Sequence, residues 1–274
     1  MLGADLVPVL AGAGYQVFAR PKSDLDVTRP EDVLRAFRDV RPEIVVNCAA
    51  FTKVDACESE PLAFEVNHRG VEILAAECRS REAHLVQIST DFVFDGRKGT
   101  PYVEDDPPAP LSAYGRSKLA GEEAARGAPA ALVVRASWLF GLAGWNFVEA
   151  ILKQIASGKS PLTVVDDQRG RPTSTTDLSA ALLALLDRGA AGTFHFANRG
   201  EVSWFDFARE IAARAPGGAP DVVPIDSASL ARPARRPAYS VLDTGKYERE
   251  TGFPIRHFRA PLAEYLAARA RPPA

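Results

Sequence analysis

Residues 43–89 read EIVVNCAAFTKVDACESEPLAFEVNHRGVEILAAECRSREAHLVQIS and contain two short apolar runs with a helical pattern between them. The runs EIVVNCAA (43–50) and HLVQIS (84–89) are apolar on both faces, as are strands of a parallel sheet that is covered on both sides. The stretch between them, residues 60–81, has the length and pattern of a helix. Strand, helix and strand in this order predict a right-handed βαβ unit.

The same alternation continues on both sides of this unit. The runs YQVFA (15–19) and AALVVRAS (130–137) predict two more strands, and residues 2–13, 29–40 and 111–125 predict helices. The sequence therefore predicts an α/β fold with a doubly wound parallel sheet, the Rossmann arrangement that binds nucleotides.

The pattern changes after residue 144. Helical segments then dominate, and short apolar runs at 162–166, 192–198 and 221–225 interrupt them. We expect a Rossmann domain over residues 1–144 and a smaller α/β lobe over residues 145–274, with contributions that cross between the two.

The N-terminus departs from the usual order of a nucleotide-binding sheet. Such a sheet begins with a strand and a glycine-rich turn, whereas this chain begins MLGADLVPVLAGAG, where Gly3 corresponds to the last glycine of such a turn. Loss of a central strand would leave unpaired backbone on both neighbouring strands. We expect either that about ten further residues precede this sequence or that another segment fills the gap, and we favour the first.

The composition indicates a globular protein of a reducing compartment. The chain of 274 residues carries a net charge of −2 and has no persistent basic cluster, which argues against nucleic acid as its main partner. Its three cysteines show no C-x-x-C spacing, so neither a disulfide framework nor a zinc site is indicated. With no run of about 18 apolar residues, no membrane span is expected, and we predict a cytoplasmic location.

Tyr114 and Lys118 lie four residues apart in SAYGRSKLAGE (112–122), on one face of a predicted helix. One interpretation is a surface pair in which the lysine stem covers the ring. The other is catalytic. A nearby ammonium favours the phenolate and would lower the pKa of Tyr114, so that the tyrosine can exchange a proton with a carbonyl or alcohol oxygen.

Hydroxyl groups stand where the strand HLVQIS ends. Ser89 and Thr90 follow it, and ligands bind at the carboxyl ends of such strands. A Ser-Thr pair alone is more often a turn or a helix cap. A hydroxyl followed about 24 residues later by Tyr-x-x-x-Lys instead predicts a site that orients and reduces a carbonyl.

These motifs resemble those of the extended short-chain dehydrogenase/reductase superfamily. Within it, the chain is most similar to the dTDP-4-dehydrorhamnose reductase family, from Gly3 to about Leu266. The matching segments are VVNCAAFTKVDACESEP (45–61), STDFVFDG (89–96), YGRSKLAGE (114–122), RASWLFG (135–141), VVDDQRGRPT (164–173), GTFHFAN (192–198), SWFDFA (203–208) and RRPAYSVLD (235–243).

The resemblance implies an NADPH-dependent reduction of dTDP-4-dehydro-L-rhamnose to dTDP-L-rhamnose. Tyr114 would donate the proton, and Thr90 would polarise the carbonyl. Lys118 would tune the acidity of Tyr114 and hold the nicotinamide ribose. Two alternatives remain. One is a reductase of another nucleotide keto-sugar. The other is a non-catalytic NADP-binding subunit like the β-subunit of methionine adenosyltransferase, which resembles the same family.

The resemblance also implies the binding residues. The cofactor would meet Gly3, Ala49, Ala50 and Phe51, with Asp26 and Val27 near its adenine, and Phe51 stands where relatives often have histidine. The nucleotide-sugar would meet Asp91 and Trp138, although Trp138 could equally be a core aromatic residue. Candidates for its diphosphate or sugar are Gln168, Arg171, Arg235 and Arg236.

Arg20 bears on the choice of cofactor. An acidic residue after the second strand would bind the 2′-hydroxyl of NAD, whereas an arginine accommodates the 2′-phosphate of NADP. Arg20, with Lys22 nearby, therefore favours NADPH, with NADH as the alternative, although a solvated basic turn would look the same. The four histidines lack ligand spacing, so no metal site is expected. A monomer or a homodimer is expected.

Overall fold

A parallel four-stranded sheet forms the centre of the molecule in this computed structural model, which describes residues 1–215 and 220–270. Its strands stand in the order β1-β2-β3-β8, and the register pairs Ile44 with His84 and Leu85 with Ala131. The strands are β1 (Ile44–Asn47), β2 (His84–Thr90), β3 (Ala130–Ala136) and β8 (Gly192–Phe196). The predicted α/β parallel fold is confirmed.

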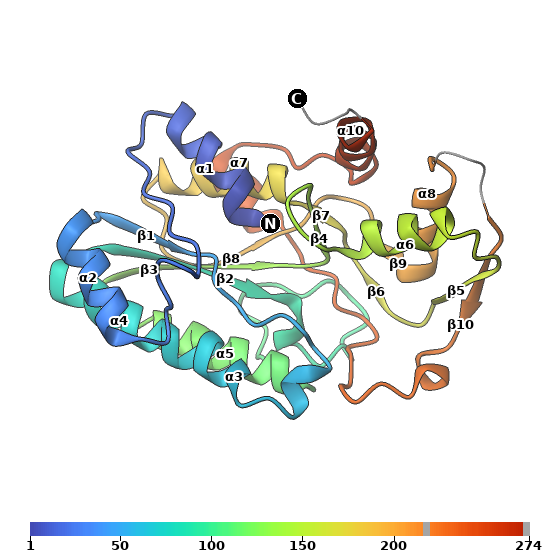
Figure 1. Cartoon of the computed structure of the whole chain (residues 1–274), viewed down its shortest axis with the longest axis horizontal. Helices are drawn as coiled ribbons and strands as arrows, with labels where there is room; N and C mark the ends of the chain where they lie inside the picture. Colours follow the sequence, from blue (N-terminus) through green and yellow to red (C-terminus); the bar gives the residue numbers. More distant parts are fainter. Residues whose placement is uncertain (216–219, 271–274) are drawn as a thin grey trace.

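Helices cover both faces of this sheet (Figure 1). On one face lie α1 (Leu2–Gly12) and α7 (Thr175–Leu186), and on the other lie α4 (Gly70–Arg81) and α5 (Ala113–Ala125), with α2 (Pro30–Val40) against α4. Side chains alternate along the strands, so each face has its own core. The α1 face buries Leu6, Val86, Val134, Leu178 and Leu182, and the α4 face buries Phe37, Val71, Leu74, Leu85 and Val133.

The predicted strand at residues 15–19 is wrong. The segment is extended, but it takes no place in the hydrogen-bonded order, in which β1 is an edge strand. Tyr15 and Val17 still pack against the core of the α1 face, while Phe18 is exposed. The segment therefore keeps the side-chain alternation of a strand without a partner for its backbone, and alternation alone cannot reveal whether that partner exists.

The predicted helix at 60–81 forms with a local irregularity. Its parts are α3 (Leu62–Phe64), η2 (Glu65–Arg69), which is a π-helical turn, and α4. The π turn carries Asn67, which is buried and donates both to the Phe51 carbonyl and to the Ser117 hydroxyl, at 3.0 Å each. A Cβ at Gly121 would lie 2.1 Å from the Asn67 carbonyl, so only glycine allows α5 to approach this closely.

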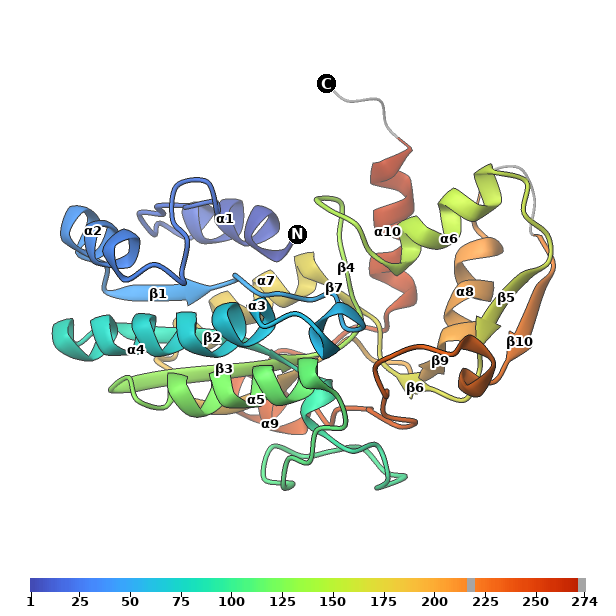
Figure 2. The same cartoon turned by 60° about the horizontal axis from the view of Figure 1, so that its bottom comes forward.

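The rest of the chain packs beside the carboxyl ends of the strands (Figure 2). Its apolar core includes Phe140, Ile151, Leu162, Phe207 and Phe258. Its helices are α6 (Phe147–Ala156), α8 (Trp204–Ala212) and α10 (Arg259–Arg269), and its strands are β4 (Leu139–Phe140), β5 (Leu162–Val165), β6 (Arg169–Gly170), β7 (Thr173–Ser174), β9 (Val202–Ser203) and β10 (Val222–Ile225). Short helices complete the order: η1 (Ala56–Glu58), η3 (Asp91–Val93), η4 (Ser227–Leu230) and α9 (Gly245–Thr251).

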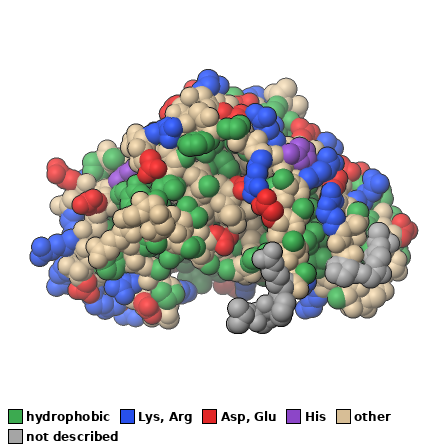
Figure 3. All heavy atoms as spheres, turned by 90° about the horizontal axis from the view of Figure 1, so that it is seen from above, with side chains coloured by type: hydrophobic (Ala, Val, Ile, Leu, Met, Phe, Trp, Pro, Cys, Tyr) green, Lys and Arg blue, Asp and Glu red, His purple; other side chains and the backbone are tan. Residues whose placement is uncertain are grey.

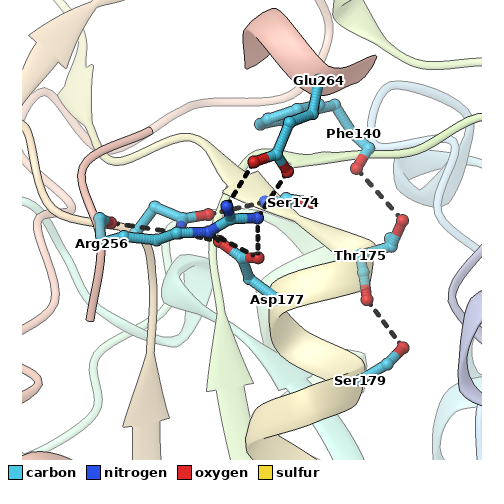
Figure 4. A network of polar contacts seen from close by, with 8 residues as sticks. Phe140, Ser174, Thr175, Asp177, Ser179, Arg256 and Glu264 are labelled. Atoms are coloured by element: carbon cyan, nitrogen blue, oxygen red, sulfur yellow. Dashed lines mark hydrogen bonds and ion pairs between the residues drawn. The ribbon is translucent and has the colours of Figure 1, made fainter. Parts of the chain in front are cut away.

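The two parts of the chain are interleaved. Although α7 and β8 follow residue 144, they belong to the central sheet and its cover. A polar network also ties α7 to the second part, because Arg256 bridges Asp177 on α7 and Glu264 on α10 at 2.6 and 2.5 Å (Figure 4). The division at residue 144, with contributions that cross between the two parts, stays a prediction.

Acidic and basic side chains are interspersed on the face shown in Figure 3. This mixture matches the small net charge of −2. Among the helices of the described ranges, none combines the length and the hydropathy that crossing a bilayer requires.

Candidate active site

Thr90 ends β2 at the carboxyl edge of the sheet and is buried. Its hydroxyl accepts the N–H of Phe92 (3.2 Å) and so caps η3, and it donates to Asp91 Oδ1 (3.0 Å). The sequence left open whether this hydroxyl caps a helix or meets a substrate. The structure shows that it caps one, at a place where it can also face a ligand.

Tyr114 and Lys118 occupy the first turns of α5, which begins at the N-cap Ser112, whose hydroxyl accepts the N–H of Gly115 (3.1 Å). The Tyr114 ring packs edge to face on Phe92, with ring centroids 5.7 Å apart. Lys118 is buried, and its Nζ donates to the Ile88 carbonyl (2.7 Å). The helix start and the strand end therefore bring Thr90, Tyr114 and Lys118 together.

Burial dominates the acidity of this pair. It raises the pKa of Tyr114, and the nearby Asp91 carboxylate adds to the rise, while a hydrogen bond with Thr90 opposes it. Burial lowers the pKa of Lys118 to about 8, against the opposing effect of Glu122. The expectation that Lys118 lowers the pKa of Tyr114 is thus not met. The tyrosine is a neutral phenol near pH 7, the form that can give a proton.

Asp91 lies directly behind Thr90 and is buried. Burial raises the pKa of Asp91 to about 6. Its Oδ1 accepts from Thr90 and its Oδ2 accepts from the hydroxyl of Ser240 (2.5 Å). The carboxylate therefore faces two protein hydroxyls, a geometry that differs from the direct sugar contact which the resemblance implies.

A buried ion pair stands one turn further along α5. Glu122, which is 0% exposed, binds Arg135 on β3 through two bonds of 2.8 and 2.7 Å, and it accepts from Ser89 (2.6 Å). His195 lies beside Arg135, and burial lowers the pKa of His195 to about 3, so this imidazole is neutral. Sequence reasoning missed this group, although an arginine within the apolar run AALVVRAS and a glutamate in KLAGE were visible signals.

The residues expected along the cofactor also gather at this edge. Ala49 and Ala50 follow β1, and a Cβ at Gly3 would lie 3.9 Å from that of Cys48. α1 begins there at Leu2 without a side-chain cap, so the N–H groups of its first turn can receive a pyrophosphate. The Phe51 backbone is fixed by Asn67 (2.8 and 3.0 Å). The residues present therefore fit a dinucleotide.

The basic turn that follows residues 15–19 is open to solvent. Arg20 and Lys22 are exposed, which fits both a 2′-phosphate site and a solvated basic turn. Asp26 accepts the Thr28 hydroxyl and N–H (2.7 and 3.0 Å), and these bonds lower its pKa. Asp26 therefore organises this turn, beside the buried Val27.

Trp138 lies where the chain leaves the sheet for the second lobe. Its backbone has φ +48°, which is rare for a bulky residue, and its ring stacks on Trp204 with centroids 3.5 Å apart. A Cβ at Gly170 would lie 2.5 Å from the ring, so this position requires glycine. Trp138 is half-buried, which leaves both the core and the substrate-contact interpretations open.

The polar candidates of the second lobe differ in their partners. Arg236 forms a bidentate pair with Asp55 (3.0 and 3.0 Å), and Gln168 donates to Ser227 (2.6 Å). Arg171 donates to the Leu242 carbonyl (3.0 Å), while its buried Nε has no partner among the described residues. Arg235 is exposed. Of these four, Arg171 is the one with a buried donor still to be satisfied, a feature expected of a ligand contact.

A parallel sheet with a hydroxyl, a tyrosine and a lysine at its carboxyl edge defines a nicotinamide-dependent reductase of the short-chain dehydrogenase type. Sequence comparison narrows this class. The family model described as RmlD substrate binding domain matches residues 1–271, and the chain belongs to this family.

Individual relatives agree with this assignment. The dTDP-4-dehydrorhamnose reductase of Streptomyces griseus is 42% identical over 98% of this chain and 90% of its own. The dTDP-4-keto-6-deoxy-D-glucose reductase of Streptomyces niveus is 40% identical over 96% of this chain and 92% of its own. A dTDP-4-dehydrorhamnose reductase of Bacillus anthracis, solved in complex with NADP, superposes with a TM-score of 0.92 at 34% identity, over 97% of this chain and 95% of its own.

Proposed function

We propose that this protein reduces the 4-keto group of dTDP-4-dehydro-L-rhamnose with NADPH and yields dTDP-L-rhamnose. The observation that carries the proposal is the convergence of Thr90, Tyr114 and Lys118 at the carboxyl edge of the sheet. The relatives from S. griseus and B. anthracis support the substrate and the cofactor. The family and the named reductases favour an enzyme over a non-catalytic binding subunit.

The chemistry divides between the cofactor and the protein. NADPH, when bound, supplies the hydride that C4 of the sugar receives. Tyr114 gives its phenolic proton to the C4 oxygen, so the carbonyl becomes an alcohol and the tyrosine is left as a phenolate. Thr90 binds the same oxygen through its hydroxyl and holds the keto group in front of Tyr114.

Lys118 and the edge around it would hold the cofactor. With a pKa of about 8, Lys118 is mainly an ammonium at pH 7, and it is already held by the Ile88 carbonyl. Its remaining N–H groups would bind the nicotinamide ribose. Gly3, Ala49, Ala50 and Phe51 would line the dinucleotide, and Arg20 would favour the 2′-phosphate of NADPH over NADH.

The sugar nucleotide would enter between the sheet and the second lobe. Arg171 would bind its diphosphate through the unpartnered Nε, and Trp138 would contact the base or the sugar. Gln168 and Arg236 would join only after exchanging their present partners, Ser227 and Asp55. The S. niveus relative is named for another keto-sugar, so a related dTDP-keto-sugar is the second candidate substrate.

The test is a reductase assay with the purified protein. Loss of NADPH absorbance should follow addition of dTDP-4-dehydro-L-rhamnose, and NMR of the product should show dTDP-L-rhamnose. A parallel assay with the dTDP-4-keto-6-deoxyglucose series separates the two candidate substrates. Absence of turnover with every nucleotide keto-sugar, by protein that binds NADPH, would contradict the proposal.

Two whole-protein properties belong to the same proposal. We expect a monomer or a homodimer, which light scattering during size exclusion would distinguish from a larger assembly. We also expect the protein in the cytoplasm, which cell fractionation would test.

A further inference from the structure

An extended segment, residues 238–243, runs between the sheet and the second lobe and is fixed on both sides. The Ser240 N–H donates to the Arg169 carbonyl (2.9 Å) in the second lobe. On the other side, the Asp243 N–H donates to the Tyr102 carbonyl (2.7 Å) in the loop that follows β2. This backbone has little freedom, so the side chain of Ser240 has a defined place.

That side chain reaches the catalytic strand. Ser240 is 2% exposed, and its hydroxyl donates to Asp91 Oδ2 (2.5 Å). The other oxygen, Oδ1, accepts from the hydroxyl of Thr90 (3.0 Å). A line of hydrogen bonds therefore joins the segment from the second lobe, through a buried carboxylate, to the threonine beside Tyr114.

The Thr90 hydroxyl has a single proton, and an ionised carboxylate can only accept. In this arrangement the proton points to Asp91 while the N–H of Phe92 occupies one lone pair of the Thr90 oxygen. To polarise a keto oxygen, Thr90 has to turn its proton away from Asp91. Removing a hydrogen-bond donor from a buried carboxylate costs free energy unless another donor stays in place.

We propose that Ser240 is a positioning residue of the reduction: its hydroxyl keeps the Asp91 carboxylate paired while the hydroxyl of Thr90 turns from Asp91 to the keto oxygen. The inference rests on the proposed function, and it deepens that function by adding a residue from outside the Thr-Tyr-Lys group. Ser240 touches neither reacting atom, so its effect passes through Asp91 and Thr90.

The test is a double-mutant cycle on turnover of dTDP-4-dehydro-L-rhamnose. Ser240→Ala should lower kcat roughly tenfold, with KM for the sugar nucleotide changed by less than about twofold. In an Asp91→Asn background, where no buried charge needs the second donor, Ser240→Ala should change kcat much less. Equal losses in both backgrounds, or an unchanged kcat in Ser240→Ala, would overturn the inference.

Ser179→Ala is the matched control, because Ser179 is also a buried donor but bonds the Thr175 carbonyl (2.7 Å) on α7 (Figure 4). The helix α7 lies across the sheet from α5 (Figure 1). The Ser179→Ala variant should leave kcat unchanged. A crystal structure of Ser240→Ala gives a readout that needs no turnover: the 3.0 Å bond from Thr90 to Asp91 should be retained or shortened, because Thr90 is then the remaining side-chain donor to the buried carboxylate. Loss of this bond in the variant would count against the inference even if the wild-type protein reduced no keto-sugar.

Discussion

At the scale of single residues, the site depends on how burial sets protonation. Tyr114 and Lys118 are adjacent on α5, yet burial moves their pKa values in opposite directions, upward for the phenol and downward for the amine. Both shifts favour the neutral form, because a low-dielectric surrounding disfavours charge of either sign. Tyr114 therefore keeps its proton near neutral pH and can act as an acid.

The lowered pKa of Lys118 predicts a pH-dependent stability. Between about pH 8 and the ordinary value of 10.5, the unfolded chain binds more protons at Lys118 than the folded chain, so this residue makes stability rise with pH. Wild type should gain about 1–2 kcal/mol over Lys118→Met between pH 7.5 and pH 9.5 in urea unfolding. The exposed Lys159→Met is the control and should show no such gain. If the stability of wild type relative to Lys118→Met fell as the pH rises, this would contradict the assignment of the lowered pKa to burial.

The sequence predicted the positions of these residues but not the shifts in their pKa values. Tyr-x-x-x-Lys preceded by a hydroxyl was sufficient to select Thr90, Tyr114 and Lys118, because chain order and helical spacing bring them together. The direction of the Tyr114 shift depends on its burial and on Asp91, neither of which the spacing reveals. The bond from Ser240 to Asp91 joins residues 149 positions apart, and no local pattern predicts it.

At the scale of elements, α5 is fixed against the sheet by charge. Glu122 and Arg135 join α5 to β3 while they are 0% and 2% exposed. Removing one member of such a pair leaves an uncompensated buried charge, so Glu122→Gln should lower the free energy of unfolding by about 3–5 kcal/mol. Urea unfolding measures this loss. Arg259→Gln removes the exposed pair with Glu210 and should cost less than about 1 kcal/mol. Equal losses of unfolding free energy in Glu122→Gln and Arg259→Gln would refute the claim that the buried pair matters more than the exposed one.

The crossing of α5 over the π turn depends on one missing methyl group. A Cβ at Gly121 would meet the Asn67 carbonyl at 2.1 Å, so Gly121→Ala should force the two elements apart and destabilise the fold by about 1–3 kcal/mol. Gly12→Ala in α1 meets nothing within 4 Å and should be neutral or slightly stabilising. Thermal unfolding of both variants is the measurement. If Gly121→Ala unfolded at the same temperature as wild type, the close contact between α5 and the π turn would not require glycine.

At the scale of the whole molecule, the sequence predicted the central strands of the sheet better than it predicted which segments lie at the edges of the sheet. Three of the four central strands followed from runs that are apolar on both faces. The run at 192–198 was also predicted as a strand. Its place beside β3 depends on α7, which packs on the α1 face of the sheet and leads the chain back to it. The segment at 15–19 has strand alternation without a paired backbone, so pattern alone overestimated it.

The central claim is that Tyr114 donates the proton, and the turnover number of Tyr114→Phe tests it most directly. The variant keeps the ring that packs on Phe92 and loses only the hydroxyl. With dTDP-4-dehydro-L-rhamnose and NADPH, kcat should fall by at least about a hundredfold, the contribution expected of a positioned general acid. Tyr15→Phe, which removes an exposed hydroxyl that donates to Asp187, should retain full activity. A Tyr114→Phe protein that binds NADPH and turns over within about twofold of wild type would contradict the account.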